Sequence, residues 1–305
     1  ADGVDREAWI TEFGWDTLAG HVVTEHQQAA YAQRGYMIQR VAGIDKCFWY
    51  WWRDTTKEPN NFFDGCGILD PRNEAKPVAA AISAMAWMLQ RPEPVGTFDF
   101  EPNGFGYVVE DRGRLVACAF QLDPNGEQPT LTLDSGDLYD MYGNPLEKRT
   151  HKLGLDPVWA VGIDRDHPFV KEAAYELSTP YLVRVTAGDS HTIHFEGQAT
   201  PATFRVDAPA SWDVSPKEGT MSLRADTTSA GDVRVEVDPE EDFGTQHVVI
   251  RLEQGEVKKT FDVEFLTIAA AELTVPPLEG DPGRTTLRAL VKNNSSADAT
   301  LSAQA

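Results

Sequence analysis

The sequence contains few cysteines and no long hydrophobic run. Its 305 residues include only Cys47, Cys66 and Cys118. Three cysteines are too few for a disulfide framework, so we expect Cys47 and Cys118 to be small buried residues on strands. A Cys47–Cys66 bridge is the alternative. No apolar run approaches the roughly 18 residues of a membrane-spanning helix, so we expect no membrane span.

Basic residues are also scarce. Lys and Arg number 27 against 48 Asp and Glu, which gives a formal net charge of −21 at pH 7. Nucleic acid is therefore not an expected partner, because binding it depends on neutralising phosphates with basic side chains. The acid excess favours solubility, and a saline habitat is an alternative reason for it. No Gly-rich phosphate loop follows the first predicted strand, so we expect no nucleotide cofactor and no doubly wound cofactor enzyme.

Two segments contain residues that could bind a metal ion. His191 and His194 have metal-like spacing, but residues three apart on a predicted strand point to opposite faces, so we expect them to be surface histidines. Asp238 to Asp242 is acidic but lacks the ordered ligand spacing of a calcium loop, and a solvated turn is the better interpretation. We therefore expect no metal site.

The first 92 residues alternate between strand and helix patterns. Residues 47–52 are apolar at every position, which predicts a strand buried on both faces. The order strand, helix, strand, helix predicts a parallel sheet. The predicted elements are a strand that ends at Gly14, a helix from a capping box at Thr24 and Gln27 to about Ile44, a strand over 46–54, and a helix from Pro77 to about Gln90.

The first strand ends with a carboxylate. Glu12 follows the β-prone residues Trp9 to Thr11, and Gly14 allows the strand to turn into a loop. In parallel α/β architectures the carboxyl ends of the strands carry the active site, so Glu12 is a catalytic candidate. The structural alternative is a rim glutamate paired with an arginine.

Several short motifs in this region resemble those of a known group of enzymes. They are Thr11-Glu12-Phe13-Gly14-Trp15, Gln28-Ala29-Ala30-Tyr31 with Arg34, Phe48-Trp49-Tyr50, and Gly67-Ile68-Leu69 followed by Lys76-Pro77. Together they resemble the final two β/α units of clan A glycoside hydrolases, nearest to family 39-like and family 5-like members. The resemblance covers roughly residues 5–91.

The resemblance implies a (β/α)8 barrel and a retaining hydrolysis of O-glycosidic bonds. In that clan a glutamate at the end of the seventh strand is the nucleophile, and Glu12 matches it. In the same clan an aromatic residue of the eighth strand forms the floor of the sugar subsite. By this resemblance we take Trp49, Trp52 and Trp15 as candidate substrate-binding residues. Strand alternation lets only one of Trp49 and Trp52 point into a barrel. The implied substrate is a polysaccharide or oligosaccharide, and the implied location is extracellular or cell-surface.

The chain departs from this family in length. A (β/α)8 barrel needs about 250 residues, and only two of its units fit before residue 92. The clan's general acid/base is a glutamate, usually after asparagine, on the fourth strand, and nothing before Glu12 matches it. Asn73-Glu74 follows the nucleophile and is rejected. Ala1 to Glu7 is polar, unlike a signal peptide. We therefore expect a carboxyl-terminal enzyme fragment that is inactive alone.

Short strand patterns replace the α/β pattern after residue 92, so the predicted fold class is multidomain, α/β plus all-β. An alternative is a non-catalytic carbohydrate-binding or adhesive protein, but Trp159 and Trp212 are isolated and form no aromatic row. The first two predicted domains are a barrel fragment over 1–92 and a small antiparallel β-sandwich packed on it over 93–166. They are followed by an immunoglobulin-like β-sandwich over 167–268, whose seven strands come after a connector at 168–180, and by the truncated start of another β-sandwich over 269–305.

Overall fold

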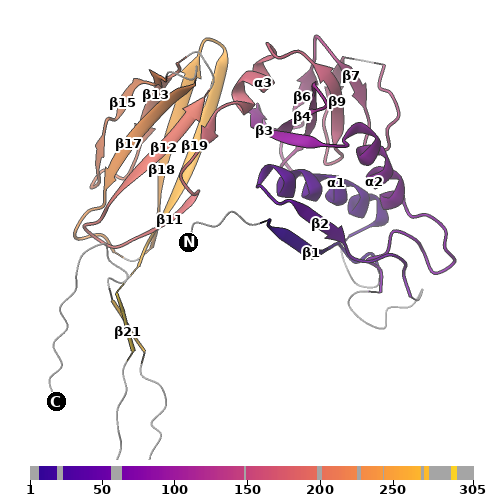
Figure 1. Cartoon of the computed structure of the whole chain (residues 1–305), viewed down its shortest axis with the longest axis horizontal. Helices are drawn as coiled ribbons and strands as arrows, with labels where there is room; N and C mark the ends of the chain where they lie inside the picture. Colours follow the sequence, from indigo (N-terminus) through magenta and orange to yellow (C-terminus); the bar gives the residue numbers. More distant parts are fainter. Residues whose placement is uncertain are drawn as a thin grey trace, which may run out of the picture. The chain divides into compact units, whose positions relative to one another are not determined.

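The computed structural model describes residues 7–18, 23–55, 64–147, 149–197, 201–224, 228–242 and 244–268, and the backbone of 271–274 and 290–293. The chain forms two compact units, residues 1–174 and residues 175–305 (Figure 1). Strands dominate the described residues of both units. None of the described helices is both long and apolar enough to cross a membrane.

The first unit begins with β1 (Trp9–Phe13), α1 (Glu25–Val41), β2 (Lys46–Trp49) and α2 (Pro77–Met88). β1 and β2 are parallel, as predicted. The predicted capping box is also present, because the Thr24 hydroxyl accepts from the Gln27 N–H and the Gln27 side chain accepts from the Thr24 N–H. Pro77 lies in the first turn of α2, where its missing N–H costs nothing.

The prediction of a strand over 46–54 buried on both faces is wrong. The strand is only Lys46–Trp49, and the side chains of Phe48 and Trp52 are 49% and 69% exposed. Helix α1 covers one face of this strand pair, and no described element covers the other. Beyond β2 the chain pairs instead with residues 66–69, through hydrogen bonds such as Trp51 N–H to the Cys66 carbonyl.

An antiparallel sheet follows the helices, with strand order β3-β4-β5-β9-β7. A separate pair of strands, β6 and β8, and a short helix α3 complete the unit. The elements are β3 (Pro92–Phe100), β4 (Gly104–Asp111), β5 (Arg114–Gln121), β6 (Thr130–Thr132), β7 (Asp137–Tyr139), β8 (Thr150–Lys152), β9 (Val158–Ile163) and α3 (Pro168–Ala173).

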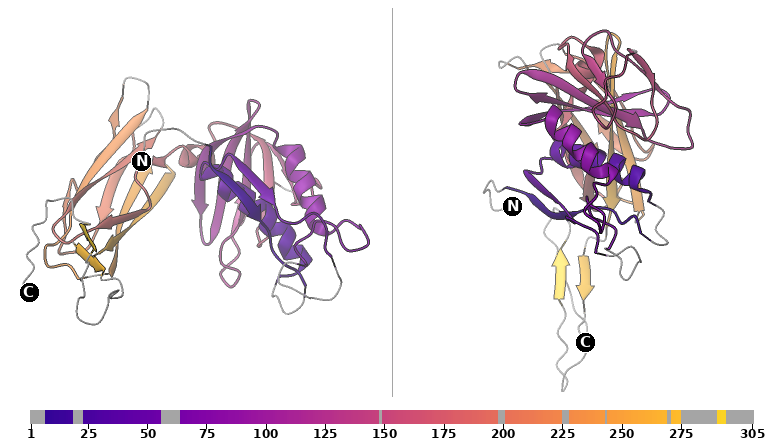
Figure 2. Two further views of the ribbon diagram at one scale, coloured as in Figure 1. Left: turned by 60° about the horizontal axis from the view of Figure 1, so that its bottom comes forward. Right: turned by 90° about the vertical axis from the view of Figure 1, so that its right-hand side faces the viewer.

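Both faces of this sheet are covered. On one face Val116 and Trp159 pack with Met37 of α1 and Met88 of α2, so the helices lie between the β1–β2 pair and the sheet (Figures 1 and 2). On the other face the sheet packs on residues from the β6–β8 layer and α3, including Leu131, Leu153 and Val170. Val170 and Ala173 of α3 lie in this core, and the first unit extends to Ala174. It therefore runs beyond the predicted border at 166, and the predicted connector at 168–180 contains α3.

A buried glutamine fastens α1 to the elements around it. The Gln33 amide nitrogen donates to the carbonyls of Ala81 (2.7 Å) and Met141 (2.8 Å), and its oxygen accepts from the Trp159 indole N–H (2.9 Å). These contacts join α1, α2, the turn after β7, and β9. An unpaired buried polar group costs free energy, so these three hydrogen bonds favour one position of α1 and α2 on the sheet.

The second unit contains two five-stranded sheets packed around one core that includes Phe195, Val233, Ile250 and Phe261. The first has the order β10-β12-β17-β14, with β16 also on β17, and the second has the order β11-β19-β18-β13-β15. The strands are β10 (Glu176–Leu177), β11 (Leu182–Val185), β12 (Ser190–Gly197), β13 (Thr203–Asp207), β14 (Asp213–Ser215), β15 (Glu218–Thr220), β16 (Ser222–Leu223), β17 (Ser229–Glu236), β18 (Gly244–Gln254) and β19 (Val257–Thr267).

Two sheets around one core form a β-sandwich, and its immunoglobulin-like character stays a prediction. β20 (Ala271–Thr274) and β21 (Leu290–Asn293) form an antiparallel pair. The rest of the predicted further domain, including Asn294 to Ala305, lies outside the described residues. All three cysteines are free, so the Cys47–Cys66 bridge is not formed; Cys118 is buried on β5, whereas Cys47 is only half-buried.

Candidate functional site

A β-bulge sets the direction of Glu12. Ile10 pairs with Cys47 and Phe13 pairs with Trp49, so Thr11 and Glu12 together oppose the single residue Phe48. An extra residue in one strand reverses the alternation of side chains beyond it. Ile10 and Phe13 therefore share a face although they are three apart, and Glu12 falls on the other face.

The helix-facing side of the β1–β2 pair is identified by its contacts. The Phe13 ring packs on Gly35 of α1 and lies edge-on to Tyr36, with ring centroids 5.2 Å apart. Thr11, Glu12 and Phe48, on the opposite side, are all exposed. Among the described residues Glu12 has no hydrogen bond or ion pair, so the predicted alternative of a rim glutamate paired with an arginine does not hold there.

Gly14 allows the two chain segments beyond β1 and β2 to come into backbone contact. A Cβ atom added to Gly14 would lie 2.1 Å from the Tyr50 carbonyl oxygen. The Tyr50 N–H donates to the Phe13 carbonyl at 2.8 Å, immediately beside this contact. The glycine in the Glu12-Phe13-Gly14 motif thus fixes the backbone next to Glu12.

The three candidate tryptophans lie in different surroundings. Trp49 packs with Phe13 and Trp15 on the helix side, with ring centroids 5.5 Å and 6.1 Å away, and donates its indole N–H to the Cys66 carbonyl. Trp15 also contacts Tyr31 of α1. The structure therefore places Trp49 and Trp15 in the packing between the strands and α1, away from the face that carries Glu12. Trp52 is exposed.

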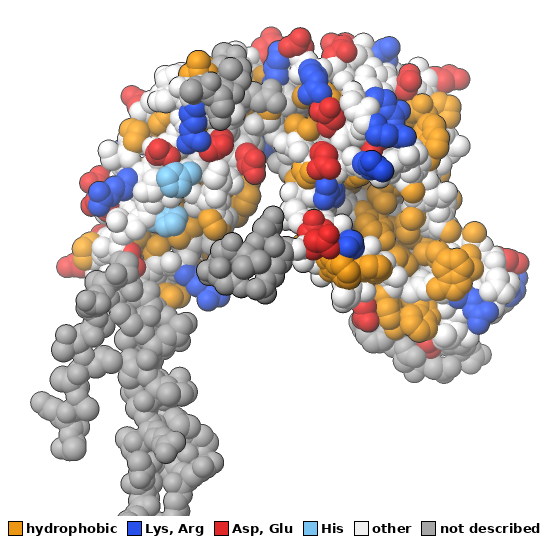
Figure 3. Space-filling model, viewed as in Figure 1, with side chains coloured by type: hydrophobic (Ala, Val, Ile, Leu, Met, Phe, Trp, Pro, Cys, Tyr) orange, Lys and Arg blue, Asp and Glu red, His pale blue; other side chains and the backbone are white. Residues whose placement is uncertain are grey.

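Four of the exposed large hydrophobic side chains of the first unit lie on β1, β2 and the segment after β2, where Figure 3 shows a hydrophobic surface; they are Trp9, Phe48, Trp51 and Trp52. Trp9 and Phe48 are about half exposed and contact each other, with ring centroids 6.1 Å apart. The Lys46 ammonium lies 4.1 Å from the Trp9 ring centroid and pairs with Glu7. Trp9 and Lys46 lie at the amino-terminal ends of the strands, Phe48 lies opposite Thr11 and Glu12, and Trp51 and Trp52 lie beyond the carboxyl end of β2.

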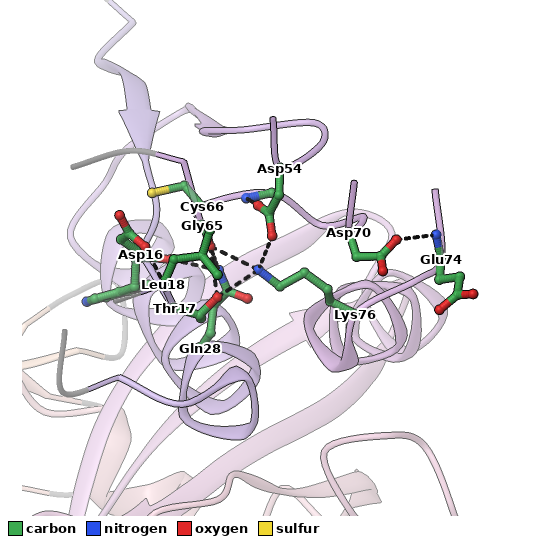
Figure 4. A network of polar contacts seen from close by, with 12 residues as sticks. Asp16, Thr17, Leu18, Gln28, Asp54, Gly65, Cys66, Asp70, Glu74 and Lys76 are labelled. Carbon is green, nitrogen blue, oxygen red and sulfur yellow. Dashed lines mark hydrogen bonds and ion pairs between the residues drawn. The ribbon is translucent and has the colours of Figure 1, made fainter. Parts of the chain in front are cut away.

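Sequence reasoning missed a buried lysine that joins the loops at the carboxyl ends of β1 and β2. The Lys76 ammonium donates to the Thr17 hydroxyl (2.9 Å), the Gly65 carbonyl (2.9 Å) and the Asp54 carboxylate (3.0 Å), as Figure 4 shows. We call these four residues the Lys76 network. The side chains of Lys76 and Asp54 are only 1% and 3% exposed. The one sequence signal was the Lys76-Pro77 pair before α2.

The residues around this network are closely fitted. The Gly65 carbonyl accepts from the Thr17 N–H and hydroxyl, from Gln28 and from Lys76. The Gly67 N–H donates to the second Asp54 oxygen at 2.6 Å. Burial raises the pKa of the Asp54 carboxyl, and the bonds from Lys76 and Gly67 oppose that rise. The ion pair is thus stabilised by hydrogen bonds on both carboxylate oxygens.

The two segments with metal-like composition differ in their contacts. The His191 ring lies edge-on to Phe265, whereas His194 contacts Asp232, so the two histidines are in different surroundings. The Asp238 carboxylate accepts from the Glu240 N–H within a turn. Over the ranges that the structure describes, no group of three or more His, Cys, Asp and Glu side chains is placed to hold a metal ion.

Comparison with known proteins found no matching family model and no matching curated protein. Among solved structures, a family 39 glycoside hydrolase from Bacteroides cellulosilyticus WH2 shares 19% identity at a TM-score of 0.46, over 54% of this chain and 35% of that one. A family 30 subfamily 8 xylanase from Clostridium acetobutylicum shares 10% identity at a TM-score of 0.37, over 52% and 43%.

A γ-CGTase from the alkalophilic Bacillus clarkii shares 12% identity at a TM-score of 0.33, over 88% of this chain and 42% of that one. The chain thus spans less than half the length of each of these three proteins. All three TM-scores are low, so a function for this protein has to rest on its own residues.

Proposed function

We propose that residues 1–91 are the last two β/α units of a retaining glycoside hydrolase and that Glu12 is its nucleophile. The observation that carries the proposal is the bulge in β1, which directs Glu12 to the helix-free face of a parallel strand pair at its carboxyl end. In a (β/α)8 barrel the helices lie outside the strands, and the active site lies at the strands' carboxyl ends. The sequence resemblance independently assigns the same role to Glu12.

The proposed chemistry is a double displacement. The Glu12 carboxylate attacks the anomeric carbon and forms a glycosyl ester, while a second carboxylic acid protonates the departing glycosidic oxygen. The second group then removes a proton from water, which hydrolyses the ester and restores Glu12. We propose that this acid/base, held about 5–5.5 Å from the nucleophile, is supplied from outside residues 1–305, so the 305-residue chain alone is inactive.

The proposed substrate is a polysaccharide or oligosaccharide, and the proposed location is outside the cell or at its surface. Of the three tryptophans, Trp52 is the best candidate for stacking on a sugar ring, because its indole is 69% exposed beyond the carboxyl end of β2. An indole face suits the apolar C–H face of a pyranose. The contacts of Trp49 and Trp15 favour a structural role for both.

The proposal is tested in the complete protein that carries these residues. A mechanism-based fluorosugar should label the peptide containing Glu12, and Glu12→Gln should abolish labelling and lower turnover by several orders of magnitude without unfolding the protein. Glu74→Gln is the matched control, because Glu74 is an exposed glutamate on the loop before α2 that pairs with Arg72. Labelling of a carboxylate other than Glu12 would refute the assignment.

A further inference from the structure

The structure points to Lys76 as a positioning residue: we infer that its ammonium holds the loops after β1 and β2 together and so fixes Trp52 relative to Glu12. The catalytic part of this inference rests on the proposed function, whereas the clamp itself does not. Lys76 is the residue immediately before α2, so it ties both loops to a helix end.

The geometry of the ammonium supports a clamp. A lysine ammonium has three N–H donors, and here all three have acceptors that belong to different parts of the chain. Thr17 belongs to the loop after β1, Asp54 to the segment after β2, and Gly65 to a third segment, which leads to α2. Figure 4 shows the ammonium at the point where these segments meet. The clamp therefore joins three segments with one side chain.

The strap transmits this constraint to the tryptophans. We define the strap as residues 65–69, whose backbone runs beside residues 51–54. The Ile68 N–H donates to the Trp51 carbonyl, the Leu69 N–H to the Trp52 carbonyl, and the Asp54 N–H back to the Leu69 carbonyl. Asp54 thus contacts both Lys76 and the strap, and the path of the backbone at Trp52 depends on where Asp54 is held.

Close packing leaves the clamp little freedom to rearrange. A Cβ atom on Gly65 would lie 2.3 Å from an Asp16 carboxylate oxygen, and a Cβ atom on Gly67 would lie 2.4 Å from the Asp54 nitrogen. The planar guanidinium of arginine is larger than an ammonium and presents its donors in a fixed fork. We therefore expect that Lys76→Arg cannot reproduce the three contacts.

The clamp is tested with Lys76→Met, the double variant Lys76→Met/Asp54→Asn, and Lys46→Met as the matched control. Lys46 lies at the amino-terminal end of β2, away from the Lys76 network, and its half-exposed side chain contacts Trp9 and Glu7. In the 305-residue chain, Lys76→Met should accelerate hydrogen exchange at the amides of Ile68 and Leu69 by roughly 100-fold, because it leaves Asp54 buried without its partner. Lys46→Met should not change these amides. Equal exchange in the two single variants would overturn the clamp.

Kinetics of the complete enzyme test the positioning role. The double variant removes both buried charges, so its stability should return toward that of the wild type. Its kcat should stay on the order of 100-fold low, because a misplacement of about 1 Å at a site costs that much. Recovery of kcat in step with stability would show a merely structural role. A complete wild-type protein without glycosidase activity would overturn the proposed function. The hydrogen-exchange rates of Ile68 and Leu69 would still test the clamp, because they do not depend on activity.

Discussion

Replacing Gly14 with alanine is the sharpest test of how the structure places Glu12. The added Cβ would lie 2.1 Å from the Tyr50 carbonyl oxygen, and contacts under 3.0 Å are essentially never seen for real Cβ atoms. The Tyr50 carbonyl would have to retreat by about 1 Å, which strains the hydrogen bond between the Tyr50 N–H and the Phe13 carbonyl. The substitution therefore separates the two strands next to Glu12.

The expected cost combines two effects. Overpacking of a close-fitted site costs about 1–3 kcal/mol, and weakening one hydrogen bond adds about 1 kcal/mol. Gly14→Ala should thus lower the free energy of unfolding of the first unit by roughly 2–4 kcal/mol. Under the proposed function, Gly14→Ala in the complete protein should also lower kcat, because the proposed nucleophile Glu12 is two residues away.

Urea unfolding followed by tryptophan fluorescence measures this loss. The second unit contains only Trp212, so the signal comes mostly from the first unit. Gly154→Ala is the matched control, because Gly154 has no atom within 4 Å of the added Cβ and no strained backbone angle. It should be neutral or slightly stabilising. Equal stability of the two variants would refute the close approach of Tyr50 to Gly14.

Two further substitutions test the first unit by urea unfolding. Gln33→Leu removes the side chain that bonds the Trp159 indole N–H and the carbonyls of Ala81 and Met141. It should lower the free energy of unfolding by about 3–5 kcal/mol. A decrease below about 1 kcal/mol would contradict this. Burial lowers the pKa of His167, so protonation favours the unfolded state, and this part of the stability is lost as pH falls below about 6.5. His167→Asn keeps a side-chain cap for α3 and should reduce the stability difference between about pH 5 and pH 8; an unchanged difference would exclude His167 as its source.

The sequence by itself determined the local features of the first unit. Thr24 and Gln27 fixed the start of α1, because a capping box is made by residues three apart whatever surrounds them. Pro77 fixed the start of α2 in the same way. The alternation of strand and helix was enough to predict that β1 and β2 are parallel, since a helical crossover returns the chain in the same direction.

Only the tertiary structure decided which face each site residue occupies. Simple alternation would put Ile10 and Glu12 on the same side, and the bulge between Ile10 and Phe13 reverses this. Trp49 pairs with Phe13, so its side chain lies on the same face as Phe13 and points toward α1. Lys76 became recognisable as a clamp only when its three acceptors, from residues 17, 54 and 65, were seen to converge. Bulges and buried polar contacts depend on partners distant in sequence, so no local pattern specifies them.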